Sequence, residues 1–225
     1  MKKWFKDHSY SWILSYFFIY CIWFFSLEKI DRSLHHPIRC ALDDYIPTLE
    51  IFVIPYLLWF LYVAATVLIF LFTDKADFYN CTAFLFIGMT LSLFVFTLYP
   101  SEFDRGAAPV NDNIFTCLVN LVHRIDSPTN VFPSIHCFNS IACTILYIKS
   151  NTFRTTPQTP KKKRQRNFWV KFSSVILTIL ICLSTLFIKQ HSFLDFIAAT
   201  VLSVIMYVLV YRIPWKKFSR ETHED

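Results

Sequence analysis

The chain has 225 residues, of which 55% are hydrophobic and 19% aromatic, while charged residues make up only 17%. A soluble domain usually carries about a quarter charged residues, so this chain has too little charge to solvate the surface of an ordinary globule. The mean hydropathy of +0.42 and the presence of two glycines exclude a disordered tail, a collagen-like repeat and a glycine-rich nucleotide cradle. The composition predicts a polytopic membrane protein.

Six stretches are almost free of Lys, Arg, Asp and Glu, and each is close to the length of about 20 residues that a helix needs to cross a bilayer. We therefore expect an all-α fold, an integral membrane bundle of six transmembrane helices that forms a single membrane domain over residues 1–225. The spans are expected at about residues 10–27, 51–73, 78–99, 133–148, 172–188 and 191–211. The first is expected to stay uncleaved, because Glu28 and Lys29 follow it and no small-x-small cleavage site does.

The net charge of +6 is unevenly distributed. Sixteen of the 22 Lys and Arg residues fall in the N-terminal segment, the turn near residue 75, the segment 149–171 and the C-terminal segment. Cytoplasmic loops are enriched in Lys and Arg, so this bias predicts both termini in the cytoplasm and the opposite loops outside. We expect the protein to lie in the plasma membrane, in contact with membrane lipids. The basic run Lys161–Arg166 has an alternative interpretation as a lipid-binding or nucleic-acid-binding patch, but we favour a topology signal and expect no nucleic-acid partner.

Two loops carry a recognisable pattern. The segment Asn151–Asn167 is polar and is expected to be a mobile cytoplasmic loop. In the outer segment Pro100–Asn130, apolar residues recur at helical spacing from Ile114 to Val122, through Leu118 and Leu121. This pattern predicts an amphipathic helix that lies in the outer interface.

Polar residues that lie at membrane depth are costly and mark functional sites. The predicted topology was assigned without them, yet it brings six to one level near the outer face. They are Arg105, His136, Ser184, Lys189, His191 and Asp195. A membrane bundle without a site would not require this convergence.

Two local patterns carry chemistry. His191 and Asp195 are spaced i, i+4, so the carboxylate is expected to accept the imidazole Nδ1–H and to leave Nε2 free as a nucleophile; the alternative is a polar pair that only aids packing. Pro133 and Ser134 open the fourth span, and His136 follows in its first turn. A helix start of this kind attracts an anion, and His136 is placed to deliver a proton; the alternative is an ordinary capped helix.

The segment Phe132–His136, followed by Ser184-x6-His191-x3-Asp195, resembles the phosphatidic acid phosphatase type 2 / vanadium haloperoxidase superfamily. The family motifs are Lys-x6-Arg-Pro, Pro-Ser-Gly-His and Ser-Arg-x5-His-x3-Asp, and the likeness covers about residues 99–211. The resemblance implies that His191 attacks phosphorus to form phosphohistidine, that Asp195 orients it, and that His136 protonates the leaving oxygen. It further implies no metal and no cofactor.

The resemblance also implies residues that hold the phosphoryl oxygens, namely Ser134 and Arg105, with Ser184 from the third motif. Several family positions differ here. Leu98 stands in place of the family lysine, Ile135 in place of the motif glycine, and Thr185 in place of the third-motif arginine. Lys189, two residues before His191, is a hypothetical substitute for one missing cation.

We expect a phosphatase that acts on a lipid phosphate or diphosphate monoester, with its site facing outward. Two alternatives remain. The Phe-Pro-Ser-x-His variant also resembles the inositol phosphorylceramide synthase branch, which implies transfer of a phosphoalcohol headgroup to a lipid hydroxyl. The missing cations motivate the other alternative, a non-catalytic scaffold or transporter, which we rank last because transport ordinarily uses broken, glycine-containing helices and Gly88 is the only glycine in a predicted span. The natural lipid and the oligomeric state are left open.

Overall fold

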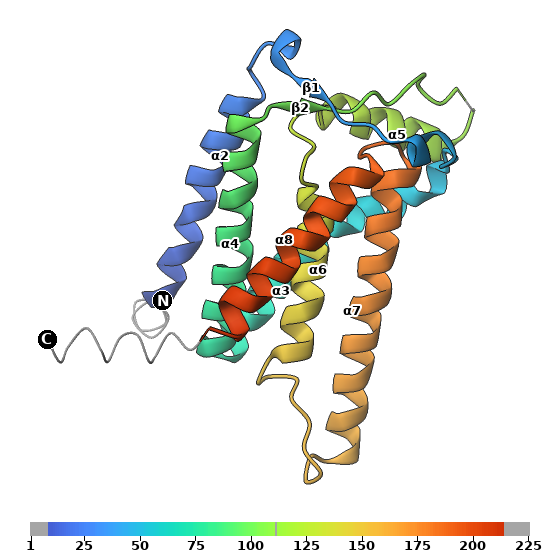
Figure 1. The fold of residues 1–225 in the computed structure, drawn as a ribbon. Helices are drawn as coiled ribbons and strands as arrows, with labels where there is room; N and C mark the ends of the chain where they lie inside the picture. Colours follow the sequence, from blue (N-terminus) through green and yellow to red (C-terminus); the bar gives the residue numbers. More distant parts are fainter. Residues whose placement is uncertain (1–8, 111, 214–225) are drawn as a thin grey trace, which may run out of the picture.

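Seven α-helices make up most of residues 9–110 and 112–213, the part of the chain that the computed structural model describes (Figure 1). They are α2 (Tyr16–Leu27), α3 (Val53–Thr73), α4 (Lys75–Leu98), α5 (Ile114–Ile125), α6 (Ile135–Lys149), α7 (Lys161–Phe187) and α8 (Phe193–Tyr211). The 3₁₀ turn Ser9–Ser15 runs directly into α2, and the turn Glu50–Phe52 runs into α3. Two further 3₁₀ turns, Arg32–Leu34 and Ala41–Asp44, lie in the loop between α2 and α3. The all-α prediction is confirmed.

Five of these helical segments are long and apolar enough to cross a membrane. They are Ser9–Leu27, Glu50–Thr73, Lys75–Leu98, Lys161–Phe187 and Phe193–Tyr211. The predicted fourth span corresponds to α6, an apolar helix of only 15 residues. At 1.5 Å per residue it is about 22 Å long, which is shorter than the hydrocarbon core of a bilayer. The count of six transmembrane helices therefore stays a prediction.

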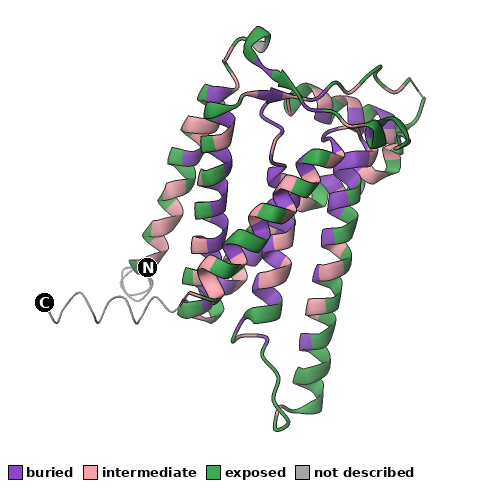
Figure 2. Ribbon diagram, viewed as in Figure 1, coloured by how far each residue is buried: buried purple, intermediate pink, exposed green. Residues whose placement is uncertain are grey.

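Helix α6 lies at the centre of the bundle, where it packs against α3, α4, α7 and α8 (Figure 1). Figure 2 shows that buried residues face the inside of the bundle, while exposed residues cover its outside. Many of the exposed side chains are large and apolar, among them Phe18, Phe60 and Val204. A soluble protein rarely leaves such a surface open, so the outside of the bundle has the chemistry of a lipid-facing surface.

A short parallel ladder holds the loop that leads into α6. Strand β1 (His36–Pro37) pairs with β2 (Ser101–Glu102), and Glu102 also forms an antiparallel bridge with Thr129. The hydroxyl of Ser101 accepts hydrogen bonds from the backbone N–H groups of Val131 and Phe132, both at 3.1 Å. The ladder thus fixes the backbone just before the start of α6.

One prediction for these segments was wrong, and two others were close to the structure. The segment 161–167 was expected in a loop but is the start of α7, because Lys, Arg and Gln are good helix formers and Pro160 precedes them as the N-cap. Helix α8 begins at Phe193, two residues later than predicted, because Ser192 serves as its N-cap. Helix α5 forms as predicted and buries Thr116, Val119 and Val122, while its position in the outer interface stays a prediction.

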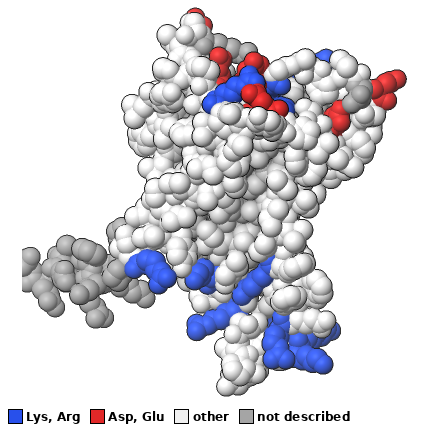
Figure 3. All heavy atoms as spheres, turned by 45° about the vertical axis from the view of Figure 1, so that its right-hand side comes forward, with Lys and Arg blue, Asp and Glu red and all other residues white. Residues whose placement is uncertain are grey.

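Charge is concentrated at the two ends of the bundle. In the view of Figure 3, Lys and Arg gather at the lower end, the middle is free of charged side chains, and the upper end carries both signs. The long loop between α6 and α7 lies at the lower end, whereas α5 and the β ladder lie at the upper end (Figure 1). The terminal residues 1–8 and 214–225, whose cytoplasmic position was predicted, lie outside the described residues.

Candidate active site

His191 and Asp195 form a close pair at the turn between α7 and α8. The imidazole Nδ1 of His191 is 3.2 Å from Oδ2 of Asp195, and the same oxygen accepts the backbone N–H of Ser192 at 2.9 Å. His191 lies in the turn rather than in the helix, and Asp195 lies in the first turn of α8. Because a carboxylate accepts only, His191 donates Nδ1–H and turns an unprotonated Nε2 toward the rest of the site.

The charge of Asp195 also decides the protonation of His191. Burial alone would lower the pKa of His191, but the hydrogen bond and the charge of Asp195 outweigh it, so the pKa is raised above its usual value. His191 is only 6% exposed and Asp195 is fully buried. The pair therefore favours an imidazolium more than water does, as it must if the ring is to acquire positive charge during a reaction.

His136 enters the site from the first turn of α6. Ser134 is the N-cap of that helix, and its Oγ accepts the N–H of Cys137 at 3.3 Å. The His136 ring contacts two aromatic rings of α3, with centroid distances of 4.7 Å to Tyr56 and 4.3 Å to Trp59. These contacts restrict the imidazole to the side of α6 that faces the α7–α8 turn.

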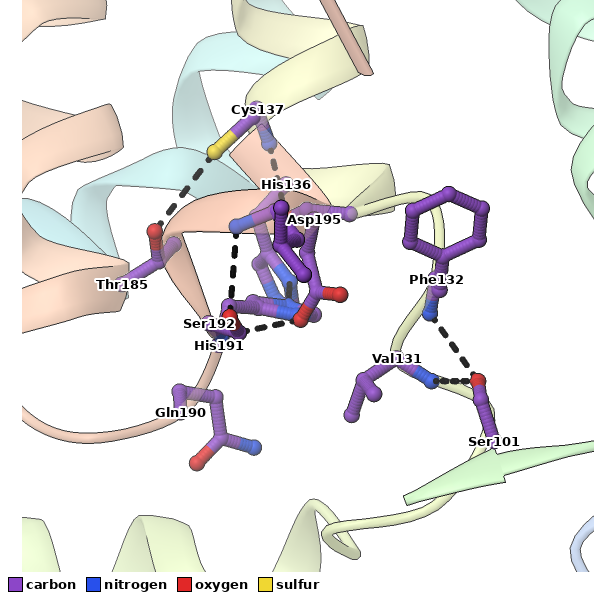
Figure 4. Close-up of polar contacts among 12 residues, drawn as sticks. Ser101, Val131, Phe132, His136, Cys137, Thr185, Gln190, His191, Ser192 and Asp195 are labelled. Atoms are coloured by element: carbon purple, nitrogen blue, oxygen red, sulfur yellow. Dashed lines mark hydrogen bonds and ion pairs between the residues drawn. The ribbon is translucent and has the colours of Figure 1, made fainter. Parts of the chain in front are cut away.

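The two imidazoles meet directly. Nδ1 of His136 lies 3.3 Å from Nε2 of His191, and Figure 4 shows both rings beside Asp195 in the space between α6 and the α7–α8 turn. The backbone links the same elements, because the N–H of Ser134 donates to the carbonyl oxygen of Asp195 at 3.3 Å. Sequence spacing could place His191 beside Asp195, but only the packing of α6 against α8 brings His136 to the pair.

Two carboxylates that the sequence reasoning missed support the histidines. Asp126 follows α5, and its Oδ2 lies 3.7 Å from Nε2 of His136. Asp43 lies in the loop after β1 and binds the start of α8 through Ser192. Asp126 carried one usable signal, since it follows the amphipathic helix on the side of the membrane where His136 was predicted. Asp43 is 149 residues away from Ser192 and carried no local signal.

The predicted phosphate-binding cations are held by backbone carbonyl groups. The guanidinium of Arg105 donates to the carbonyls of His123 and Asp126, at 2.9 and 2.6 Å. The ammonium of Lys189 donates to those of Asp43 and Ile46, at 2.8 and 2.5 Å. Both cations also line a cavity of about 220 Å³, whose other walls come from Arg39, Asp43, Asp44, Phe103, Asp104 and Gly106.

Ser184 and Thr185 serve the end of α7. The hydroxyl of Ser184 donates to the carbonyl of Ile181 at 2.6 Å, and that of Thr185 donates to Cys182 at 2.8 Å. The Thr185 carbonyl in turn accepts the backbone N–H groups of Gln190 and His191. These contacts shape the turn that presents His191, and Thr185 brings no positive charge to the site. Within the described residues, no cluster of three or more His, Cys, Asp or Glu side chains is arranged to hold a metal ion.

Comparison with known families gives one match. The family model for the PAP2 superfamily matches residues 58–219, a region that contains Asp126, His136, His191 and Asp195. No curated protein and no solved structure shows a significant match to the chain.

Proposed function

Because the chain belongs to the PAP2 superfamily, a family of phosphatase-type hydrolases, we propose that it is a membrane phosphatase that cleaves lipid phosphate or diphosphate monoesters through a phosphohistidine intermediate. One observation carries the proposal. A buried carboxylate, an oriented imidazole and a second imidazole lie in sequence, from Asp195 through His191 to His136, with separations of 3.2 and 3.3 Å. This is the arrangement that a nucleophile with a neighbouring acid–base partner requires.

In the first step, the lone pair on Nε2 of His191 forms a bond to phosphorus, and the bond between phosphorus and the leaving oxygen breaks. The leaving oxygen takes a proton from His136, while Asp195 stabilises the positive charge on His191. In the second step, a water molecule gives a proton to His136 as its oxygen attacks phosphorus. The bond between phosphorus and Nε2 breaks, its electron pair returns to His191, and inorganic phosphate leaves. Each histidine has one task in each step, and the protons balance over the cycle.

The closeness of the two imidazoles implies a movement. A phosphoryl group bonded to Nε2 needs the space that Nδ1 of His136 occupies at 3.3 Å. Substrate binding therefore separates the rings, and the leaving oxygen enters between them. The start of α6 at Ser134 points the positive end of a helix toward the incoming anion. Arg105 and Lys189 line a cavity whose other charged walls are Arg39 and the carboxylates of Asp43, Asp44 and Asp104. Its three cations and three carboxylates balance, so we assign the attraction of the phosphate to the start of α6 and not to this cavity.

The site is proposed to face the extracytoplasmic side of the plasma membrane. The supporting observation is the concentration of Lys and Arg at the opposite end of the bundle (Figure 3), because the positively charged ends of membrane helices stay in the cytoplasm. The apolar chain of the substrate is proposed to lie along the lipid-facing surface, with its headgroup at the end of the bundle where α6 begins.

Phosphate release by the purified protein in detergent tests the proposal, with a panel of lipid phosphates and diphosphates as substrates. We expect His191→Ala and His136→Ala to abolish turnover of alkyl phosphates, while the matched control His36→Ala, an exposed histidine stacked on Tyr99, keeps it. A second experiment looks for the phosphohistidine itself. With a substrate labelled at phosphorus, alkaline quenching during turnover should leave labelled phosphate bound to the wild-type protein and none bound to His191→Ala. Unchanged turnover in the two active-site variants would refute the mechanism. A new phosphodiester, formed when diester donors and alcohol acceptors are supplied, would favour the transferase alternative.

A further inference from the structure

Asp126 is held rigidly at the edge of the site by contacts from several elements. Its backbone carbonyl accepts hydrogen bonds from Arg105 at 2.6 Å and from Gln190 at 3.3 Å. Its own N–H closes the end of α5 through the carbonyl of Val122. The Tyr56 hydroxyl, from α3, donates to Oδ2 of the side chain. A carboxylate fixed in this way can act on a neighbouring charge without reorganising.

We propose that Asp126 is a positioning residue for His136: its carboxylate faces Nε2 of the ring and favours the protonated form against the effect of burial, so that the ring can donate a proton to the leaving oxygen. This inference rests on the proposed function and deepens it. It assigns one carboxylate to each imidazole, Asp195 to His191 and Asp126 to His136.

The order of donors and acceptors carries the proposal. Asp195 fixes the proton of His191 on Nδ1, so a neutral, nucleophilic His191 can only accept at Nε2. His136 must then donate from Nδ1 across the 3.3 Å contact. Its remaining nitrogen, Nε2, faces Oδ2 of Asp126 at 3.7 Å. Two lone pairs would repel each other there, whereas a protonated Nε2 forms an ion pair.

The other groups around His136 do not supply the same stabilisation. His191 brings a second imidazole, which disfavours a charge on the first. Tyr56 and Trp59 contribute neutral rings from α3. Burial also opposes the imidazolium, because the side chain of His136 is only 12% exposed. Within the described residues, Asp126 is the one carboxylate within ion-pair distance of His136.

The 3.7 Å separation fits a ring that has to move. A hydrogen bond would be shorter, with a donor–acceptor distance near 2.9 Å, and would hold the imidazole in one place. An ion pair at this distance persists while His136 swings away from His191 to admit the phosphoryl group. The hydrogen bond from the Tyr56 hydroxyl meanwhile holds the carboxylate in place beside the ring.

Leaving-group dependence in the variant Asp126→Asn provides the test. The change keeps the size of the side chain and removes its charge. Hydrolysis of an alkyl phosphate needs a proton on the departing alkoxide, so its kcat should fall about 10- to 100-fold, part of the contribution of a general acid. Hydrolysis of p-nitrophenyl phosphate needs little protonation and should fall less than about threefold. The alkaline limb of the kcat profile should move to lower pH. Tyr56→Phe should lower the kcat for the alkyl phosphate and move the alkaline limb to lower pH, each by a smaller amount than Asp126→Asn.

Asp31→Asn is the matched control, because Asp31 is an exposed carboxylate in the loop after α2. It should leave both substrates and the pH profile unchanged. Equal losses with the two substrates and an unmoved alkaline limb in Asp126→Asn would overturn the inference while leaving the proposed function in place. A wild-type protein without phosphatase activity would overturn both. If Asp126→Asn does not fold, Tyr56→Phe decides by the same two readouts.

Discussion

Asp43 and Ser192 are 149 residues apart in the chain, yet they share a hydrogen bond of 2.7 Å at the start of α8. The other carboxylate oxygen of Asp43 accepts the backbone N–H of Phe193 at 2.8 Å. The Asp43 carbonyl binds the ammonium of Lys189. The loop between α2 and α3 is therefore fastened to the turn that carries His191, on both sides of that histidine.

Replacement of Asp43 by Asn should destabilise the protein. The two carboxylate oxygens accept hydrogen bonds from Ser192 and Phe193, and the NH₂ group of Asn would face one of these donors and leave its hydrogen bond unmade. The expected loss is about 1–3 kcal/mol of unfolding free energy, the cost of an unmade buried hydrogen bond. It can be measured as a fall in melting temperature in detergent. Asp44→Asn is a matched control, since it removes an exposed ion pair with Arg39 and should change the melting temperature little.

The same substitution has a predictable pH dependence. Burial would raise the pKa of Asp43, but hydrogen bonds from Ser192, Phe193 and Cys40 outweigh it, and the pKa is lowered. The stabilisation is therefore complete above the ordinary carboxylate pKa of about 3.9 and is lost as the pH falls through the lower, folded-state value. The gap in melting temperature between wild type and Asp43→Asn should be constant from neutral pH to about pH 5 and should narrow in stronger acid. A gap that widens in acid would contradict this account.

His191 should control the acidic limb of the pH profile. Its pKa is raised by Asp195 against the effect of burial, and it attacks only when neutral, so the acidic limb of kcat/KM should lie above the ordinary imidazole value of about 6.5. In Asp195→Asn, burial acts without the carboxylate and the limb should move to lower pH. The kcat should fall by about 10²- to 10⁴-fold, because the reactive tautomer is no longer held. If the acidic limb of kcat/KM stays at the same pH in Asp195→Asn, a group other than His191 controls it.

Five helices long and apolar enough to cross a membrane were predictable, because length and the absence of charge decide them, whereas the predicted fourth span corresponds to the shorter helix α6. The pairing of His191 with Asp195 was also predictable, because the two residues are only four apart. The predicted reason was wrong, since they do not share a helix face: His191 lies in the turn before α8, and Asp195 faces it from the first turn of that helix. Asp126 was not predictable in this way. It reaches His136 through the loop 126–134, which has nine residues, and no periodic pattern describes the path of that loop. Asp43 depends on contacts between distant segments, which a single sequence does not reveal.

The basic segment at the start of α7 shows a different limit of sequence reasoning. Charge and flanking prolines suggested a loop, yet residues 161–167 are helical. The residues involved favour helix intrinsically, and the apolar stretch that follows gives the helix a nucleus to extend. Charge is thus the basis for predicting a cytoplasmic position for this segment, which stays a prediction, but charge did not determine its conformation.

Glu28 should be needed to order the loop that precedes α6. At the end of α2 it accepts hydrogen bonds from the Asn130 amide at 3.0 Å and the Thr129 hydroxyl at 3.3 Å, and also from the hydroxyl of Ser127. Asn130 has a left-handed backbone with φ of 55°, so this loop depends on side-chain partners. Glu28→Ala should lower the melting temperature and the kcat together. Hydrogen exchange over residues 127–134 should rise, whereas Glu50→Ala, at the start of the turn before α3, should leave that segment protected.

The contact between Gly88 and Phe138 should be sensitive to a single methyl group. A Cβ at position 88 would lie 1.9 Å from Cζ of the Phe138 ring, so α4 and α6 could keep their spacing only if the ring moved. Phe138 follows His136 by two residues on α6, and a displaced ring would shift the start of that helix. Gly88→Ala should therefore lower the melting temperature by an amount equivalent to about 1–3 kcal/mol and reduce kcat.

A second substitution tests whether the loss of stability in Gly88→Ala comes from the clash with Phe138 or from the loss of the glycine itself. Phe138→Leu removes the clashing end of the ring, so the double variant Gly88→Ala/Phe138→Leu should be more stable than the two single effects added together. The coupling in this double-mutant cycle should favour the double variant by about 0.5–3 kcal/mol, as for residues in contact. Additive effects would show that the two helices can move apart at this point. The position of His136 would then be set by its contacts with Tyr56 and Trp59 rather than by the packing of α4.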